Sequence, residues 1–257
     1  MAKIAYILLC HKDPDAIIKQ AQRLTATGDY MSIHFDASAN PKSFAQVKAA
    51  LADNDNVTYA HKRIKCGWGE WSLVQATLYA VESAIDAFPR ATHFYMLSGD
   101  CMAVKSAEYI HKFLDENDAD FIESFDYFES DWIKTGMKEE RLIYRHYFNE
   151  RTQKRRFYAS YHTQQRLGLT RKIPEDIQVQ IGSQWWCLRR RTIEWVIDFT
   201  KNQRRNAVFQ HHMDSRRNVL SDRCAPCCAR YRNSHTHADF FAVFGLRVTR
   251  DILRRSL

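Results

Sequence analysis

The chain has 257 residues, 45% of them hydrophobic and 13% aromatic, which is enough to bury one sizeable core as a single α/β domain or two small ones. Its formal net charge of +8 is unevenly placed. Residues 211–257 contain nine Arg and no Lys against four Asp and no Glu, a balance of +5, whereas the 29 basic and 26 acidic residues of 1–210 give only +3. Because most of the charge lies outside the larger part of the chain, the basic balance does not indicate a nucleic-acid partner, and none is expected.

No run of apolar residues suggests a membrane segment. The first one, residues 4–10, is too short for the core of a signal peptide or for a bilayer span, and no later run is long enough to span. The cysteines of residues 1–210 lie without regular spacing, which suits reduced thiols better than a disulfide framework. The sequence therefore predicts a cytoplasmic protein, with peripheral membrane contact left open.

Strand-like apolar runs alternate with segments of helical periodicity. In chain order, the predicted elements are strand 3–10, helix 13–27, strand 30–35, helix 41–52, strand 56–61, helix 71–87, strand 92–97, helix 107–117, strand 119–123, strand 181–188 and helix 192–200. The clearest helix is 71–87, whose apolar residues recur at intervals of three and four. This alternation predicts an α/β fold with a mostly parallel sheet and helices on both faces.

The segment 141–172 departs from this pattern, because its periodicity weakens and Arg and Lys are interspersed with Tyr and Phe. One hypothesis is a binding surface for RNA or an anionic membrane, since cations hold phosphates and aromatic rings stack on bases. That hypothesis would make the chain a non-catalytic binding protein. The other is a solvated insertion whose aromatic side chains pack together.

Polar residues stand at the ends of four predicted strands: His11, Asp36 and Asp100 follow theirs, and Glu123 ends strand 119–123. In open α/β sheets, ligands bind at the carboxyl ends of the strands, although a carboxylate in such a place often only caps the next helix. Four such residues at successive strand ends favour a binding site. The chain has neither G-x-G-x-x-G nor G-x-x-x-x-G-K-[ST], so neither a dinucleotide fingerprint nor a P-loop is predicted.

The spacing Asp-x-Asp, which in many sugar-nucleotide enzymes holds a divalent metal against a diphosphate, occurs at residues 13–15, 53–55 and 118–120. All three lie at predicted helix starts or in loops rather than at the end of a central strand, so we expect structural roles for them. A departing diphosphate would then need Arg or Lys for charge stabilisation. No metal and no other cofactor is expected.

Five motifs, in this order and at these intervals, resemble the core-2/I-branching β-1,6-N-acetylglucosaminyltransferase family (glycosyltransferase family 14), which includes the peptide O-xylosyltransferases. They are LLCHKDP at 8–14, IHFDAS at 33–38, WSLVQATL at 71–78, LSGDCMAVKS at 97–106 and GSQWWCLRR at 182–190. The resemblance covers residues 3–210. It implies a Rossmann-like fold of GT-A type, a UDP-sugar donor, inversion at the anomeric carbon and no metal requirement.

The resemblance also implies roles for individual residues. The implied donor-nucleotide residues are His11, Asp36 and Asp100, and the implied acceptor residues are Glu123, Lys138, Arg141 and Trp185. Met102-Ala103 stands where the family has an aromatic residue and Pro, and the loop before Lys138 differs from the family's. The flat ring of Trp185 can stack on a sugar face, but Trp185 and Trp186 can equally alternate between core and surface on a strand.

Residues 211–257 match none of these motifs. The resemblance implies a general base, the Glu of a Pro-Asp-Glu motif one helix after GSxWW, with diphosphate-binding Arg and Lys further on, but His211–Arg217 (HHMDSRR) stands there instead. Met213-Asp214 would give a Trp codon if translated one nucleotide later, and the same shift over 211–222 permits TTWIPDETFFQT. We therefore predict an incomplete GT-A domain at 1–210 and an aberrant, poorly ordered tail at 211–257. A sequencing error, a genuine frameshift and a real tail all stay open.

A zinc site is the alternative for the tail, since Cys224, Cys227, Cys228, His235 and His237 are all potential ligands, but their spacing matches no common zinc motif. The sequence-based hypothesis is thus a metal-independent inverting glycosyltransferase. It would move GlcNAc or xylose from a UDP-sugar onto a saccharide or peptide hydroxyl, and the missing Glu would impair it.

Overall fold

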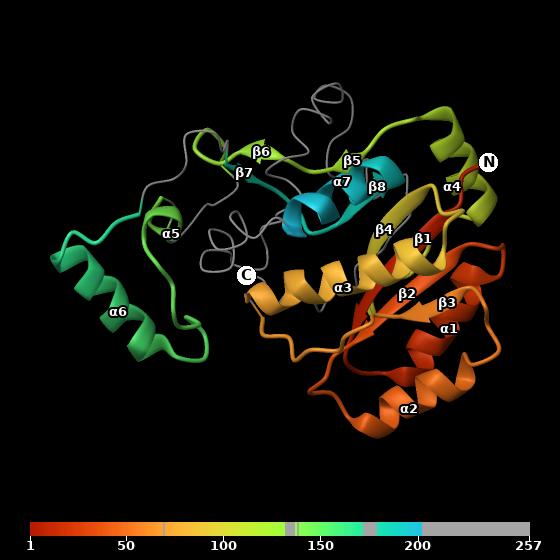
Figure 1. Cartoon of the computed structure of the whole chain (residues 1–257), viewed down its shortest axis with the longest axis horizontal. Helices are drawn as coiled ribbons and strands as arrows, with labels where there is room; N and C mark the ends of the chain where they lie inside the picture. Colours follow the sequence, from red (N-terminus) through yellow and green to blue (C-terminus); the bar gives the residue numbers. More distant parts are fainter. Residues whose placement is uncertain (69, 132–136, 138, 172–178, 202–257) are drawn as a thin grey trace.

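The computed structural model describes residues 1–68, 70–131, 137, 139–171 and 179–201, and Figure 1 shows its elements along the chain. The strands are β1 (Ile4–Cys10), β2 (Tyr30–Phe35), β3 (Val57–Tyr59), β4 (His93–Ser98), β5 (Phe121–Ile122), β6 (Phe125–Asp126), β7 (Gln180–Ile181) and β8 (Trp186–Arg189). The helices are α1 (Pro14–Thr25), α2 (Pro41–Ala50), α3 (Trp71–Ala87), α4 (Ala107–Glu116), α5 (Glu140–Ile143), α6 (Lys154–Arg166) and α7 (Arg190–Lys201). Up to β5, every predicted element is present. Among the described helices, none has both the length and the apolar character needed to cross a bilayer.

The main sheet has six strands in the order β3-β2-β1-β4-β8-β5. The first four run parallel to one another, and β8 is antiparallel to both of its neighbours, β4 and β5. Since β5 is antiparallel to β8, it points in the same direction as β4. The sheet is thus mostly parallel, as predicted, and agrees with the GT-A type of fold.

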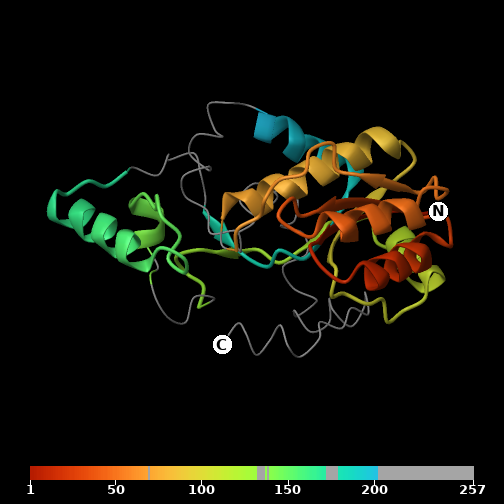
Figure 2. The same cartoon turned by 90° about the horizontal axis from the view of Figure 1, so that it is seen from below.

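Alternate residues of the strands supply two separate cores, one on each face of the sheet. Ile4, Tyr6 and Leu8 of β1 pack with buried residues of α1, α2 and α4, whereas Ala5 and Ile7 pack with those of α3 and α7. Figure 2 shows the same division, with α3 and α7 on one side of the sheet and α1 and α4 on the other. A strand buried on both faces must be apolar at nearly every position, and the apolar run in residues 3–10 (KIAYILLC) therefore predicts a strand.

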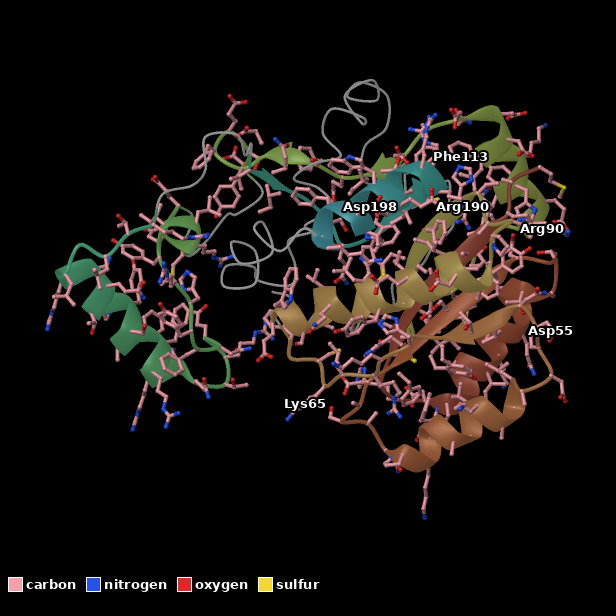
Figure 3. All side chains as sticks on the ribbon, in the orientation of Figure 1. Asp55, Lys65, Arg90, Phe113, Arg190 and Asp198 are labelled. Carbon is pink, nitrogen blue, oxygen red and sulfur yellow. The ribbon has the colours of Figure 1, made fainter. Side chains whose placement is uncertain are left out.

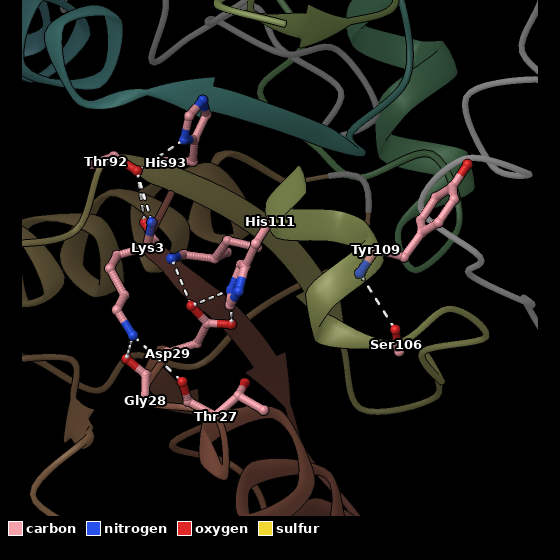
Figure 4. A network of polar contacts seen from close by, with 10 residues as sticks. Lys3, Thr27, Gly28, Asp29, Thr92, His93, Ser106, Tyr109 and His111 are labelled. Atoms are coloured by element: carbon pink, nitrogen blue, oxygen red, sulfur yellow. Dashed lines mark hydrogen bonds and ion pairs between the residues drawn. The ribbon is translucent and has the colours of Figure 1, made fainter. Parts of the chain in front are cut away.

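A buried pair, Asp29 and His111, joins the elements at the amino end of the sheet (Figure 4). The Asp29 carboxylate, completely buried before β2, lies 2.7 and 2.9 Å from Nε2 of His111 on α4 and accepts a hydrogen bond of 2.9 Å from the backbone N–H of Ile4. The backbone N–H of Lys3 donates to Thr92 Oγ1, just before β4. These contacts join β1, β2, β4 and α4 at the end of the sheet opposite the carboxyl ends of the strands.

Two predictions around β8 and α6 were wrong in part. Residues 181–188 do not form one strand: β7 pairs with β6 in a separate small sheet, β8 joins the main sheet, and the backbone bends at Gln184 between them. The weakly periodic segment 141–172 contains a helix, α6, that was not predicted. Its aromatic side chains do pack together, as the second hypothesis expected, with ring centroids 5.2 Å apart for Tyr144 and Tyr161.

Candidate functional site

The polar residues predicted from strand ends share one edge of the main sheet. The carboxyl ends of β1, β2, β4 and β5 meet there with the amino end of β8, because β8 runs in the opposite sense. Figure 3 marks this edge by Lys65, in the loop after β3, and the opposite edge by Asp55 and Arg90, which precede β3 and β4. The residues occur across the edge in the order Asp36, His11, Asp100, Trp185 and Glu123. At a strand spacing of about 4.8 Å, this series extends over about 19 Å from β2 to β5.

Asp36 holds two loops together beneath this edge. One carboxylate oxygen accepts hydrogen bonds of 2.6 Å from both the backbone N–H and the hydroxyl of Ser38, and the other accepts one of 2.9 Å from the backbone N–H of Cys66. Burial opposes ionisation of the Asp36 carboxyl, but these hydrogen bonds outweigh it and lower its pKa. Asp36 therefore stays ionised and fixes the loop after β3 to the end of β2.

Arg63, in the same loop, also holds this loop to the end of β2, a contact that was not predicted. Its guanidinium donates to the carbonyl oxygens of Phe35 and Asp36 at 2.8 and 3.0 Å and lies over the ring of Phe44. His11, one residue beyond β1, is exposed. Of the residues predicted to bind the nucleotide, Asp36 therefore organises the loops, and His11 has an accessible imidazole.

At the centre of the edge, Asp100 faces a lysine. Lys12 Nζ lies 3.4 Å from Asp100 Oδ1, so the ends of β1 and β4 carry opposite charges next to each other. Gly99 allows this approach, because a Cβ there would come within 2.8 Å of Ile17 Cδ1 and 3.2 Å of Cys10 Cβ. Lys12 was missed as a candidate, although it directly follows His11 in LLCHKDP.

Glu123 is the carboxyl group with the most perturbed ionisation at the edge. Burial raises its pKa from 4.5 to about 7, against the lowering effect of a hydrogen bond from the backbone N–H of Ser183. The backbone of Gly182 packs against the Glu123 carbonyl so closely that a Cβ would overlap it. A carboxylate poised near neutrality can accept a hydrogen bond or a proton from a substrate hydroxyl.

The two tryptophans after Gly182 differ in role. Trp186 is a core residue, 1% exposed, whereas Trp185 is partly buried at the edge and contacts both cores. The backbone N–H of Trp185 donates to Ser183 Oγ at 3.2 Å. Because Ile122 pairs with Trp186, Trp185 and Glu123 lie next to this pair on adjacent strands.

The remaining acceptor candidates are less well placed. Arg141 lies in α5, apart from the main sheet in Figures 1 and 2, and Lys138 is outside the described residues. The segment that carries Arg141 does reach the edge through other residues. The guanidinium of Arg151 lies over the ring of Trp68, and the side-chain amide of Asn149 donates to the Trp68 carbonyl at 3.0 Å.

The three Asp-x-Asp pairs occupy structural positions, as predicted. Asp13 and Asp15 flank the start of α1, and Asp53 and Asp55 lie in the turn before β3. Asp120 is buried against Arg189, with Oδ2 2.7 Å from Nη2, and the pair raises the pKa of that guanidinium. Over the part of the chain that the structure describes, no three His, Cys, Asp or Glu side chains are grouped to hold a metal ion.

A mostly parallel sheet with polar side chains along its carboxyl edge belongs to the class of α/β proteins that bind nucleotides or similar ligands at that edge. This chain belongs to the Core-2/I-Branching enzyme family, whose sequence pattern matches residues 4–226. The match continues beyond Gln210, so residues 211–226 fall inside it although they carry none of the motifs quoted above. That residues 211–257 are out of frame stays a prediction, and they lie outside the described residues.

Other comparisons add little. No curated protein matches the sequence. Two solved structures of the mannosyltransferase Ktr4p from S. cerevisiae, one in complex with GDP, each align with 11% sequence identity and a TM-score of 0.38. Each alignment covers 86% of this chain but only 66% of the Ktr4p chain, and a TM-score this low supports no argument about function.

Proposed function

We propose that this chain is built for glycosyl transfer, moving GlcNAc or xylose from a UDP-sugar to a hydroxyl of a saccharide or peptide with inversion and without a metal ion. Family membership supports the reaction class. One structural observation supports separate donor and acceptor parts of the site. The proposed donor residues His11, Asp36 and Asp100 follow the adjacent strands β1, β2 and β4. The proposed acceptor residues Trp185 and Glu123 flank the next two strands, β8 and β5. A donor and an acceptor could therefore lie side by side along one edge.

The chemistry requires an acceptor hydroxyl to attack the anomeric carbon while the bond from that carbon to the diphosphate oxygen breaks. The hydroxyl proton must pass to a base, and the diphosphate leaves with the bonding electrons. Lys12 is the cation at the centre of the edge that could offset the charge of the diphosphate. Glu123 could orient the acceptor hydroxyl through a hydrogen bond, and the ring of Trp185 could support a sugar face.

The proposal includes impaired transfer in this chain, because the family's Pro-Asp-Glu base does not occur after Gln210. Removal of a general base typically slows a reaction by about 10²- to 10⁴-fold. We therefore expect residual or absent transfer here. We expect much faster transfer from a chain in which the codons from His211 onward are translated one nucleotide later.

The test is a transfer assay on both chains, with UDP-GlcNAc and UDP-xylose, a mixed panel of saccharide and peptide acceptors, and product detection by mass spectrometry, with and without EDTA. The proposal predicts products from the shifted-frame chain at a rate that EDTA leaves unchanged. Inactivity of that chain with both donors would count against the reaction, and loss of activity in EDTA would count against metal independence. Equal, rapid transfer by the present chain would remove the need for the missing base.

A further inference from the structure

The segment 139–171, which we name the arm, concentrates the positive charge of the body, residues 1–210. It contains eight Lys and Arg and three Glu, a balance of +5, while the whole body has only +3. The body outside the arm is therefore slightly acidic, at −2. Such an asymmetry favours the attraction of partners of negative charge.

The arm's cations are available to such a partner. Five of them are exposed and have no acidic partner within the described ranges: Arg145, Lys154, Arg155, Arg156 and Arg166. Lys154, Arg155 and Arg156 form the first turn of α6, which has no acidic residue. Cations at that end oppose the helix dipole, so they do not serve the stability of α6.

The arm also stands at the edge that carries the candidate site. Figure 1 shows α5 and α6 beyond the end of the sheet from which α3 starts, and α3 follows the loop after β3. In that loop Trp68 and Glu70 accept hydrogen bonds of 3.0 Å from Asn149, and Cys66 binds Asp36. The arm follows β6 in the chain, and β6 comes directly after Glu123 and Ser124. It is thus connected both to the Asp36 end and to the Glu123 end of the site.

The surface of the arm suits neither a bilayer nor stacked bases. The exposed face of α6 carries no large apolar side chain, and rings of this helix lie against other rings, as Phe157 does on His146 with centroids 5.2 Å apart. Among the described aromatic residues of the arm, Tyr147, which precedes α6, is the one that is largely exposed, at 57%. Leu167 and Leu169 are exposed, but they follow the last turn of α6, about 20 Å along the helix from its first-turn cations. A membrane-binding helix needs an apolar face beside its cations, and a single-strand nucleic-acid site stacks successive bases on several exposed rings, which the single ring of Tyr147 does not supply.

We propose that the exposed cations of the arm bind the carboxylates of an acidic saccharide chain, and that such a chain is the acceptor class of the site. The acceptor part of this inference rests on the proposed function, whereas the binding surface itself does not. Guanidinium groups suit this ligand, because they pair with carboxylates through two parallel hydrogen bonds. A chain bound along the arm would present one end to Trp185 and Glu123.

The test measures binding of an oligogalacturonate of about ten sugars and of its neutral methyl ester to the full chain by titration calorimetry. The variants are Arg155→Glu/Arg156→Glu in the arm and Lys19→Glu/Arg90→Glu, an exposed pair elsewhere with the same change in net charge. Because Glu in the first turn favours a helix, the arm variant should fold. We expect the acidic chain but not the ester to bind, more weakly as salt rises, with at least a tenfold loss in the arm variant alone.

Equal binding of the ester, or an equal loss in the control pair, would overturn the inference. So would an arm variant that loses binding to phosphatidylglycerol vesicles or to single-stranded RNA while it keeps its affinity for oligogalacturonate. Binding of UDP by the same samples separates the two proposals. Saccharide binding without UDP binding refutes the proposed function and leaves the surface standing, and UDP binding without saccharide binding refutes only the surface.

Discussion

Replacement of Glu123 by Gln should change how the stability of the protein depends on pH. The folded protein holds the Glu123 carboxyl with a pKa of about 7 instead of 4.5, because the group is largely buried. Ionising it in the folded state therefore costs free energy. The folded state binds more protons than the unfolded state between these two values, so the free energy of unfolding contributed by Glu123 falls as pH rises from about 4.5 to 7.

The size of this effect follows from the shift. At 1.36 kcal/mol per unit, a shift from 4.5 to about 7 corresponds to at most about 3.4 kcal/mol, and partial solvent access to Glu123 reduces it to about 2 kcal/mol. The cost is absent below about pH 4.5 and complete above about pH 7. Glu123→Gln keeps the shape of the protonated acid and removes the charge, so it should nearly match the parent protein at pH 4.5 and exceed its stability by about 2 kcal/mol at pH 8.

Urea denaturation of both proteins from pH 4.5 to 8.5 tests this, with Glu129→Gln as the control at an exposed carboxylate. The difference between parent and variant cancels the titration of all other groups. A difference that stays flat across this range, or one that favours the parent protein at pH 8, would refute the burial of Glu123. A similar curve for Glu129→Gln would show that the effect is not specific to the site.

Further predictions concern the packing of the sheet and the tail. Asp29→Ala should lower the free energy of unfolding by about 3 kcal/mol or more, because His111 and the N–H of Ile4 lose their buried partner; Asp55→Ala in an exposed turn should leave it unchanged. Gly99→Ala should cost about 1–3 kcal/mol in urea denaturation through the close approach to Cys10 and Ile17. Gly182→Ala should displace Glu123 and abolish the pH-dependent difference described above, and an unaltered titration would count against that contact. Resequencing the gene across the Gln210 codon should reveal a frame error, and an unbroken frame would remove that hypothesis.

Much of the fold followed from periodicity, because the central strands β1, β2 and β4 are buried on both faces and α3 packs along its length. The division of residues 181–188 did not, since it accompanies a close tertiary approach of Gly182 to the Glu123 carbonyl that no local pattern encodes. Helix α6 was missed for a related reason. Its residues are mostly polar, so its apolar stripe is reduced to a few aromatic side chains.

The candidate site was predictable where it depends on topology and not where it depends on loops. Strand ends in a parallel sheet must share an edge, which brought His11, Asp36 and Asp100 together. The pairing of Lys12 with Asp100 and the position of Arg63 arise from loop conformations after the strands. The placement of Glu123 on the same edge needed the antiparallel strand β8, whose direction could not be deduced from its composition.

The central claim is that the carboxyl edge binds the nucleotide of a UDP-sugar, and a thermal-shift measurement with UDP tests it most directly. At a UDP concentration about a hundred times its Kd, binding should add about 2.7 kcal/mol, which raises the Tm by several degrees. We expect this rise in the presence of EDTA, a smaller one for His11→Ala at equal UDP, and the full rise for Asp55→Ala at the opposite edge. An unchanged Tm for the parent protein up to millimolar UDP, or an equal rise in the His11 variant, would contradict the account.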